Sequence, residues 1–176
     1  MAHALDKLLE TAELFQREGN DRIAFLFVGE GARKLAVKRL AEEKRLRNCV
    51  FVDKVEKEEI PQYYSVADAA LVVLKKDPLF ETVLPSKMFE AMGMGKPVTL
   101  GVEGEASRVL EESGGGVAVE PENVAGLGQE IERLASHPGL VRRFAEGGSC
   151  SVSQNFNRTK MSDLYLGILT REAGPD

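Results

Sequence analysis

The sequence predicts an α/β fold built on a doubly wound parallel sheet, because two patterns alternate along the chain. Short, continuous apolar runs are followed by longer segments in which apolar residues recur at helical spacing. The linkers between them are short, and this alternation of strands and helices gives a parallel sheet with helices on both faces. A length of 176 residues fits one domain. We therefore expect a single three-layer, Rossmann-like domain over residues 1–176.

The apolar runs are the expected strands. They cover residues 23–28, 50–52, 69–74, 97–100 and 116–119. The first run is unbroken, which is the pattern of a strand buried on both faces. The segments of helical period predict helices over residues 5–15, 35–46, 60–66, 85–95, 106–112, 124–135, 139–145 and 158–169. Ligands of such sheets bind at the carboxyl ends of the strands, so we expect the functional residues there.

Composition excludes several classes of function. The formal charge of -5 argues against a nucleic-acid partner, since binding a phosphate backbone requires a clustered basic face. All apolar runs are shorter than the roughly 20 residues of a membrane-spanning helix, and no signal-peptide pattern is visible. We therefore expect a soluble, cytoplasmic protein.

Cys49 and Cys150 belong to no Cys-x-x-Cys or Cys/His cluster, and there is no Asp-x-Asp pair, so no metal is expected.

The first candidate site is the turn Gly29-Glu30-Gly31, which separates the first predicted strand from the next helix. A strand that ends in Gly-x-Gly and enters a helix indicates a phosphate-binding turn. Asp53 follows the next strand, near the position of the ribose-binding acid in dinucleotide-binding folds. Lys34, however, stands where that pattern has its third glycine. Two interpretations stay open: a nicotinamide-dinucleotide site, and a tight turn that only needs glycine torsion angles.

The second candidate site is the start of the helix predicted from residue 85. Pro85 suits the first helical position, which places Ser86 and Lys87 in the first turn, beside free backbone N–H donors and the positive end of the helix dipole. Glu90 lies on the same helix face, one turn further on. A cation near a diphosphate and a carboxylate near a ribose would form a nucleotide site. The alternative is a solvent-exposed Lys87–Glu90 ion pair.

Several segments also match a known family. Residues 90–98, Glu-Ala-Met-Gly-Met-Gly-Lys-Pro-Val, resemble the E-A-M-A-x-G-x-P-V segment of family 4 glycosyltransferases, which have the GT-B fold. The resemblance covers essentially the whole chain, because other family segments follow in the expected order. They are residues 25–31 (F-x-x-V-G-x-G), 48–55 (N-V-x-F-x-G-x-V), 67–69 (A-D-v), 104–106, 114–116 and 121–123.

The resemblance implies that this chain is the donor-binding, C-terminal half of a two-domain glycosyltransferase, inactive by itself. Glu90 would bind the ribose hydroxyls, and Ser86 and Lys87 would contact the diphosphate of a UDP- or GDP-sugar. Val55 would hold the base through its backbone. The remaining donor-site candidates are Lys54, Gly29, Gly31, Thr82, Glu81, Gly104 and Glu105. The implied partners are the sugar nucleotide and an acceptor domain or subunit that carries the catalytic residues, with no cofactor. The resemblance also allows peripheral membrane association of the complete enzyme.

The chain departs from the family pattern in three places. Thr82 occupies the position of a second, sugar-contacting glutamate, although residues 81–87 resemble a subgroup acting in polysaccharide and glycan assembly. Asp53 replaces the glycine that precedes the base-binding loop. The first strand of such domains, with its glycine turn, is not represented, and neither is the acceptor domain. A sugar-nucleotide epimerase and a non-catalytic partner subunit remain alternative functions.

The last predicted helix carries an apolar stripe. Its members are Met161, Leu164, Tyr165, Ile168 and Leu169. In the family this helix often packs across the junction between the two domains. The alternative is that the stripe is buried on this domain's own sheet.

Overall fold

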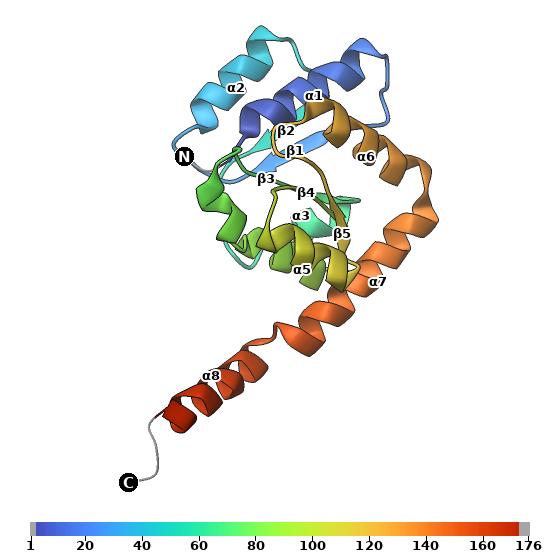
Figure 1. The fold of residues 1–176 in the computed structure, drawn as a ribbon. Helices are drawn as coiled ribbons and strands as arrows, with labels where there is room; N and C mark the ends of the chain where they lie inside the picture. Colours follow the sequence, from blue (N-terminus) through green and yellow to red (C-terminus); the bar gives the residue numbers. More distant parts are fainter. Residues whose placement is uncertain (1–2, 173–176) are drawn as a thin grey trace.

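A computed structural model of the chain describes residues 3–172 (Figure 1). It confirms the α/β fold with parallel strands, each followed by a helix. The strands are β1 (Phe25–Val28), β2 (Cys49–Val52), β3 (Ala70–Val73), β4 (Val98–Gly101) and β5 (Gly116–Ala118). The helices are α1 (Leu5–Arg17), α2 (Lys34–Glu43), α3 (Ile60–Val66), the 3-10 helix η1 (Pro78–Thr82), α4 (Ser86–Gly93), α5 (Glu105–Ser113), α6 (Val124–Ser136), α7 (Pro138–Asn155) and α8 (Arg158–Glu172).

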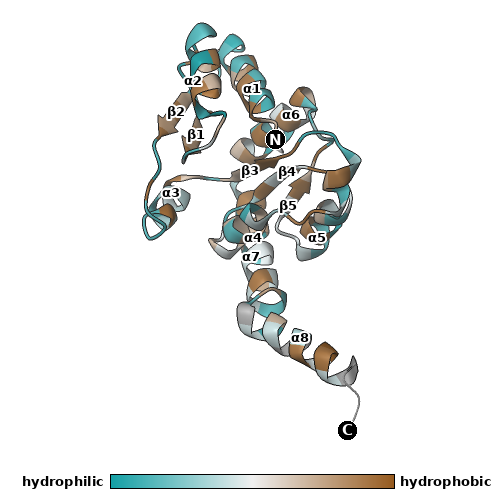
Figure 2. Ribbon diagram, turned by 90° about the vertical axis from the view of Figure 1, so that its left-hand side faces the viewer, coloured by the Kyte–Doolittle hydropathy of each residue, from teal (hydrophilic) through white to brown (hydrophobic). Residues whose placement is uncertain are grey.

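The strands form two parallel ladders instead of one continuous ladder. β1 pairs with β2, with Phe25 opposite Cys49, and β4 lies between β3 and β5. Figure 2 shows the two ladders side by side, with β1 and β3 at their adjoining edges. The expected doubly wound sheet is therefore divided between β1 and β3, which share no ladder hydrogen bonds.

Burial on both faces, which the unbroken first run predicts, is wrong for β1 and is found instead in β4. All four residues of β4 are buried. In β1 the alternation is that of a half-covered strand, because Phe25 is buried whereas Leu26 is 39% exposed. In β2, Val50 is 50% exposed. Helices α1 and α2 cover one face of these two strands, through the apolar side chains that surround Leu9 and Val37. On the opposite face, Leu26 and Val50 are exposed, whereas Val28 and Val52 are partly buried.

The largest core cluster lies between β3, β4 and the helices α4 and α5. Its centre is formed by Met88 and Met92 of α4, Leu100 of β4 and Leu110 of α5, all fully buried. Burial of side chains of this size stabilises the fold by about 1.5–3 kcal/mol each. This packing fixes α4 against the sheet through one face and leaves its other face exposed.

Helix α7 is longer than the sequence predicts, because it continues through two glycines. A Cβ atom on Gly147 would lie 2.6 Å from the carbonyl oxygen of Gly114, and one on Gly148 would lie 3.0 Å from the Cα of Gly115. These glycines therefore do not end the helix. They allow it to pack closely against the turn between α5 and β5.

Helix α8 points away from the rest of the molecule (Figure 1). Tyr165 is 63% exposed, and Met161, Ile168 and Leu169 are also exposed. Burial of this stripe on the domain's own sheet, one of the two interpretations of the sequence, is therefore wrong. The side chain of Leu164 lies outside the described residues. No helix within residues 3–172 is both long and apolar enough to cross a membrane.

Candidate functional site

The carboxyl ends of the parallel strands meet at one edge of each ladder, and the candidate residues lie in the loops that leave these edges. Gly29 and Gly31 follow β1, and Lys54 and Val55 follow β2. The long connection after β3 contains η1 and leads to α4. Gly104 follows β4 and precedes the start of α5. This is the position at which α/β sheets bind ligands.

Helix α4 begins at Ser86, one residue later than the sequence predicts. Pro85 is the N-cap residue and has an extended conformation, with φ −67° and ψ 122°. The first bond of this end runs from the Met88 N–H to the Pro85 carbonyl, at 3.0 Å. The backbone N–H groups of Ser86 and Lys87 precede it and belong to the free donors of a helix N-terminus. Together with the helix dipole, they form a positive end that suits an anion.

The side chains of Ser86, Lys87 and Glu90 are exposed on the face of α4 that points away from the core. Lys87 and Glu90 do not form the ion pair that the sequence left as an alternative. Within the described part of the chain, neither has an opposite charge within 4.0 Å, and neither side chain makes a hydrogen bond. Two unpaired charges of opposite sign therefore stand one turn apart on one helix face.

Helix α3 lies next to this face. Burial raises the pKa of Tyr64 in α3, and the negative charge of Glu90 raises it further. The carboxylate of Glu90 is thus close enough to Tyr64 to act on its hydroxyl group electrostatically.

Gly104 has a structural role that sequence reasoning missed. Its torsion angles, φ 85° and ψ −134°, are accessible to glycine but not to other residues at low cost. A Cβ atom here would lie 2.2 Å from the carbonyl oxygen of Glu81. Gly104 therefore allows η1, which carries Glu81 and Thr82, to contact the start of α5 directly. Glu105, the first residue of α5, lies 3.8 Å from Arg108 in an exposed ion pair.

The turn after β1 is held by a lysine. Gly29 has φ 124°, which confirms its need for glycine torsion angles, and no atom lies within 4 Å of the Cβ position of Gly29 or of Gly31. The ammonium group of Lys34 donates to Glu30 at 2.7 Å and to Asp53 at 2.5 Å. This contact lowers the pKa of the Asp53 carboxyl group. In the dinucleotide interpretation Asp53 would accept ribose hydroxyls, but here its carboxylate is already bound by Lys34.

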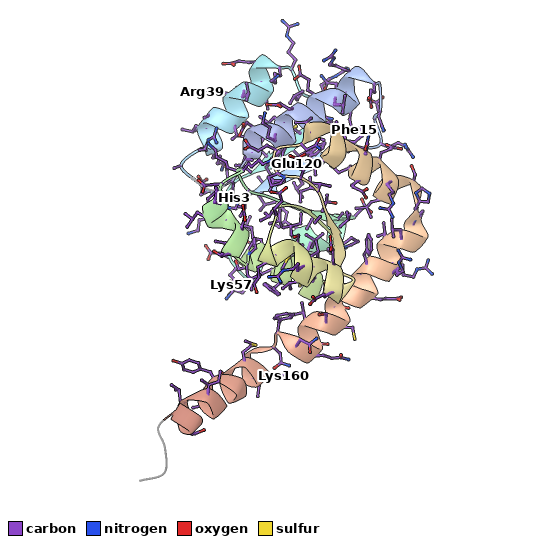
Figure 3. All side chains as sticks on the ribbon, viewed as in Figure 1. His3, Phe15, Arg39, Lys57, Glu120 and Lys160 are labelled. Carbon is purple, nitrogen blue, oxygen red and sulfur yellow. The ribbon has the colours of Figure 1, made fainter. Side chains whose placement is uncertain are left out.

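A second polar link joins the loops after β3 and β5. Lys76 donates from its ammonium group to Glu120 at 2.8 Å and from its backbone N–H to Glu122 at 2.9 Å. Figure 3 labels Glu120, which lies in the loop between β5 and α6. The sequence offers no local signal for this contact, because more than forty residues separate the partners. It fixes the start of the connection that carries η1 and α4.

The candidate residues thus form separate groups on one side of the molecule. The structure brings Glu81 next to Gly104. Between Lys87 and the loop of Lys54 and Val55, no hydrogen bond or ion pair is present among the described residues. A hollow of about 590 Å³ lies elsewhere, between α6 and α7 around His137, and includes none of the candidates. The face of α4 that carries Ser86, Lys87 and Glu90 is exposed and does not line this hollow. Residues 3–172 contain no cluster of three metal-binding side chains.

Parallel strands that alternate with helices packed against them define a Rossmann-like α/β domain. The sequence model of the family described as "Glycosyl transferases group 1" matches residues 2–149. The chain belongs to this family, which confirms the resemblance.

Three comparisons describe its similarity to known proteins. The "Putative colanic acid biosynthesis glycosyl transferase WcaI" of Escherichia coli (strain K12) is 29% identical over 148 residues, 81% of this chain and 35% of that protein. A TarM mutant of S. aureus, solved with Fondaparinux, alpha-GlcNAc-glycerol and UDP, has a TM-score of 0.81 at 20% identity, over 95% of this chain and 33% of that chain. The C-terminal domain of LpcC, a glycosyl transferase group 1 family protein of Francisella tularensis, has a TM-score of 0.66 at 19% identity, over 86% of this chain and 78% of that chain. The chain spans about a third of the length of WcaI.

Proposed function

We propose that this chain binds a nucleoside-diphosphate sugar, UDP- or GDP-linked, as the donor-binding half of a two-domain glycosyltransferase of polysaccharide or glycan assembly. The observation that carries the proposal is the pair of unpaired charges, Lys87 and Glu90, on the exposed face of α4. The family match, and the similarity in shape to a C-terminal domain of the same family, support it.

The diphosphate binds at the N-terminus of α4. The free N–H groups of Ser86 and Lys87 and the Ser86 hydroxyl donate hydrogen bonds to it, and the Lys87 ammonium supplies a full positive charge. Glu90, one turn deeper, accepts hydrogen bonds from two ribose hydroxyls. Its exposed carboxylate has both oxygens free for this purpose within the described part of the chain.

The loops around α4 bind the rest of the donor. The backbone of Val55 contacts the base, with Lys54 beside it, and the open space at Gly29 and Gly31 admits the ligand. On the sugar side, Glu81, Thr82, Gly104 and Glu105 form the η1–α5 corner. No cofactor or metal takes part in this proposal.

Transfer breaks the bond between the anomeric carbon and the diphosphate oxygen and forms one to the acceptor oxygen. Negative charge then develops on the leaving diphosphate, where Lys87 and the α4 N-terminus stabilise it. The base that removes the acceptor's proton belongs to the acceptor domain. In this arrangement the exposed α4 face is one wall of a cleft whose opposite wall is the acceptor domain.

Isothermal titration of the chain with UDP, GDP and NAD tests the proposal. We expect UDP or GDP to bind and NAD not to bind, because Lys34 stands where a dinucleotide-binding turn has its third glycine, and its ammonium group contacts Asp53. Binding of NAD without any response to the nucleoside diphosphates would overturn the assignment.

A further inference from the structure

Strand β2 has a neighbouring strand on one side only. It pairs with β1, and no other strand among the described residues pairs with it. Figure 2 shows β2 at the outer margin of the sheet, on the side away from β3. Natural proteins protect such an edge with a charged side chain, a proline or a bulge. The four residues of Cys49–Val52 contain no charge and no proline, and their register is regular, so this edge is open to another strand.

The backbone groups on the free edge belong to Cys49 and Phe51. The carbonyl groups of Asn48 and Val52 accept hydrogen bonds from β1 and its flank. Alternate residues of a strand in a parallel ladder turn their N–H and C=O groups to the same side, so those of Cys49 and Phe51 point outward. Within the described part of the chain, no turn, loop or side chain bonds to these outward groups.

An apolar strip reaches the free edge on the face of the sheet that α1 and α2 leave uncovered. The side chains of Cys49 and Phe51 pack beneath these helices. Because side chains alternate along a strand, Val50 lies on the other face, where it is exposed. Leu26 of β1 is opposite Val50 in the ladder and is exposed as well. A strand added at this edge would cover Val50 and extend the strip.

Strand β2 is complementary to a second copy of itself. A two-fold axis through Val50 places the second β2 antiparallel to the first, with Cys49 opposite Phe51 of the second copy. Residues with outward groups then face each other and exchange roughly four N–H···O=C bonds across the axis. The two Val50 residues meet at a non-hydrogen-bonded position, where opposite side chains lie closest. Backbone and side chains are therefore satisfied by the same pairing.

The flanking charges select this register. Continued beyond the strand ends, it brings Arg47 beside Asp53 of the second copy. Arg47 is exposed and forms no ion pair within the described residues. The lysine that contacts Asp53 binds Oδ1, and Oδ2 has no hydrogen-bond partner in the same part of the chain. An axis through Phe51 would instead place Arg47 opposite the apolar Val55. The charge pair therefore favours the axis through Val50.

We propose that the chain forms a two-fold symmetric homodimer through antiparallel pairing of β2 with β2 of a second copy, centred on Val50. The β1–β2 ladders of the two copies join into one sheet. Helices α1 and α2 of both copies cover one face of this sheet, and Leu26 and Val50 of both copies form a continuous apolar strip on the other. Because the paired strands are short, the dissociation constant is on the order of 10–100 μM.

Sedimentation equilibrium at concentrations from about 1 to 500 μM measures the dimerisation, and hydrogen–deuterium exchange locates it. As the dimer forms, we expect exchange of the Cys49 and Phe51 amides to slow on the order of 10-fold. The amides of Val50 and Val52 face β1 in both states and should not change. A chain that stays monomeric, or a dimer in which the Cys49 and Phe51 amides remain unprotected, would overturn the proposal.

Two charge reversals test the register. Arg47→Asp and Asp53→Arg should each weaken dimerisation on the order of 10-fold or more, because like charges then meet at both ends of the interface. An equal mixture of the two variants should dimerise again, since one carries aspartate at both positions and the other arginine. Restored dimerisation also shows that both variants fold. Arg142→Asp, at an exposed position in α7, is the matched control and should dimerise like the unaltered chain. Dimerisation that neither reversal weakens, or that mixing does not restore, would contradict the pairing of Arg47 with Asp53.

Discussion

Lys87 and Glu90 stand one turn apart on α4, and the proposed donor uses their opposite charges for different parts of one molecule. We expect Glu90→Ala to weaken binding of the favoured nucleoside diphosphate by about 1–3 kcal/mol, the usual cost of losing hydrogen bonds to a charged group. Isothermal titration measures this loss. Glu112→Ala, an exposed glutamate in α5, is the control and should bind like the unaltered chain. Unchanged binding by the Glu90 variant would remove it from the site.

Lys87→Ala should act selectively. The ammonium group is assigned to the diphosphate, so the variant should lose affinity for UDP or GDP far more than for the corresponding nucleoside. Titration with both ligands distinguishes this role from general damage to α4. Equal losses for the two ligands would contradict the assignment.

Cys49 illustrates how environment sets reactivity at a single residue. Burial raises its pKa to about 11 from 9.0, whereas Cys150 is exposed. At pH 8 the thiolate fraction of Cys49 is therefore about 100-fold below that of a free thiol. We expect a thiol reagent to modify one cysteine per folded chain rapidly, with mass spectrometry locating it at Cys150. Rapid labelling of Cys49 in the folded chain would disprove its burial.

The raised pKa of Cys49 also makes stability depend on pH. In the unfolded chain the thiol releases its proton near pH 9, so the contribution of Cys49 to stability is lost as the pH rises toward 11.

At the scale of elements, the contact between η1 and α5 depends on the absence of a side chain at Gly104. Gly104→Ala should destabilise the chain by about 1–3 kcal/mol, because alanine is strained at φ 85° and its Cβ meets Glu81. Chemical unfolding measures the change. Gly139→Ala is the matched control, since that helical glycine has open space around its Cβ position and alanine favours the helix. Equal stability of both variants would show that η1 and α5 can separate without cost.

The elements also show where sequence reasoning succeeds and where it fails. The unbroken apolar run of β1 predicts a strand buried on both faces, but β1 is only half covered, whereas all four residues of β4 are buried. Local sequence cannot distinguish them, because burial of the second face depends on a neighbour supplied from elsewhere. The sequence also predicts an end to α7 that is too early, because Gly147 serves a long-range contact with Gly114 that no local pattern shows.

For the whole molecule, α8 is an appendage to the folded body (Figure 1). Removal of residues 163–176 should leave the midpoint of thermal unfolding within about 2 °C of that of the full chain. The reason is that the side chains of Tyr165 and Ile168 are exposed and stabilise no other part of the folded body. Circular dichroism measures the midpoint. A large decrease would show that α8 packs against the body.

Shortening the chain further, to residue 135, removes α7 and its packing on α4, and should abolish cooperative unfolding.

The sequence by itself determined the order of strands and helices, the parallel topology and the family, because these follow from local periodicity and from ordered short segments such as residues 90–98. It also placed Ser86, Lys87 and Glu90 on one exposed helix face, since helical spacing is local. Only the tertiary structure decided that Lys34 holds Asp53, that Gly104 contacts Glu81 and that the sheet is divided between β1 and β3. These features join residues far apart in the chain. Their geometry depends on how the helices pack, which no local pattern specifies.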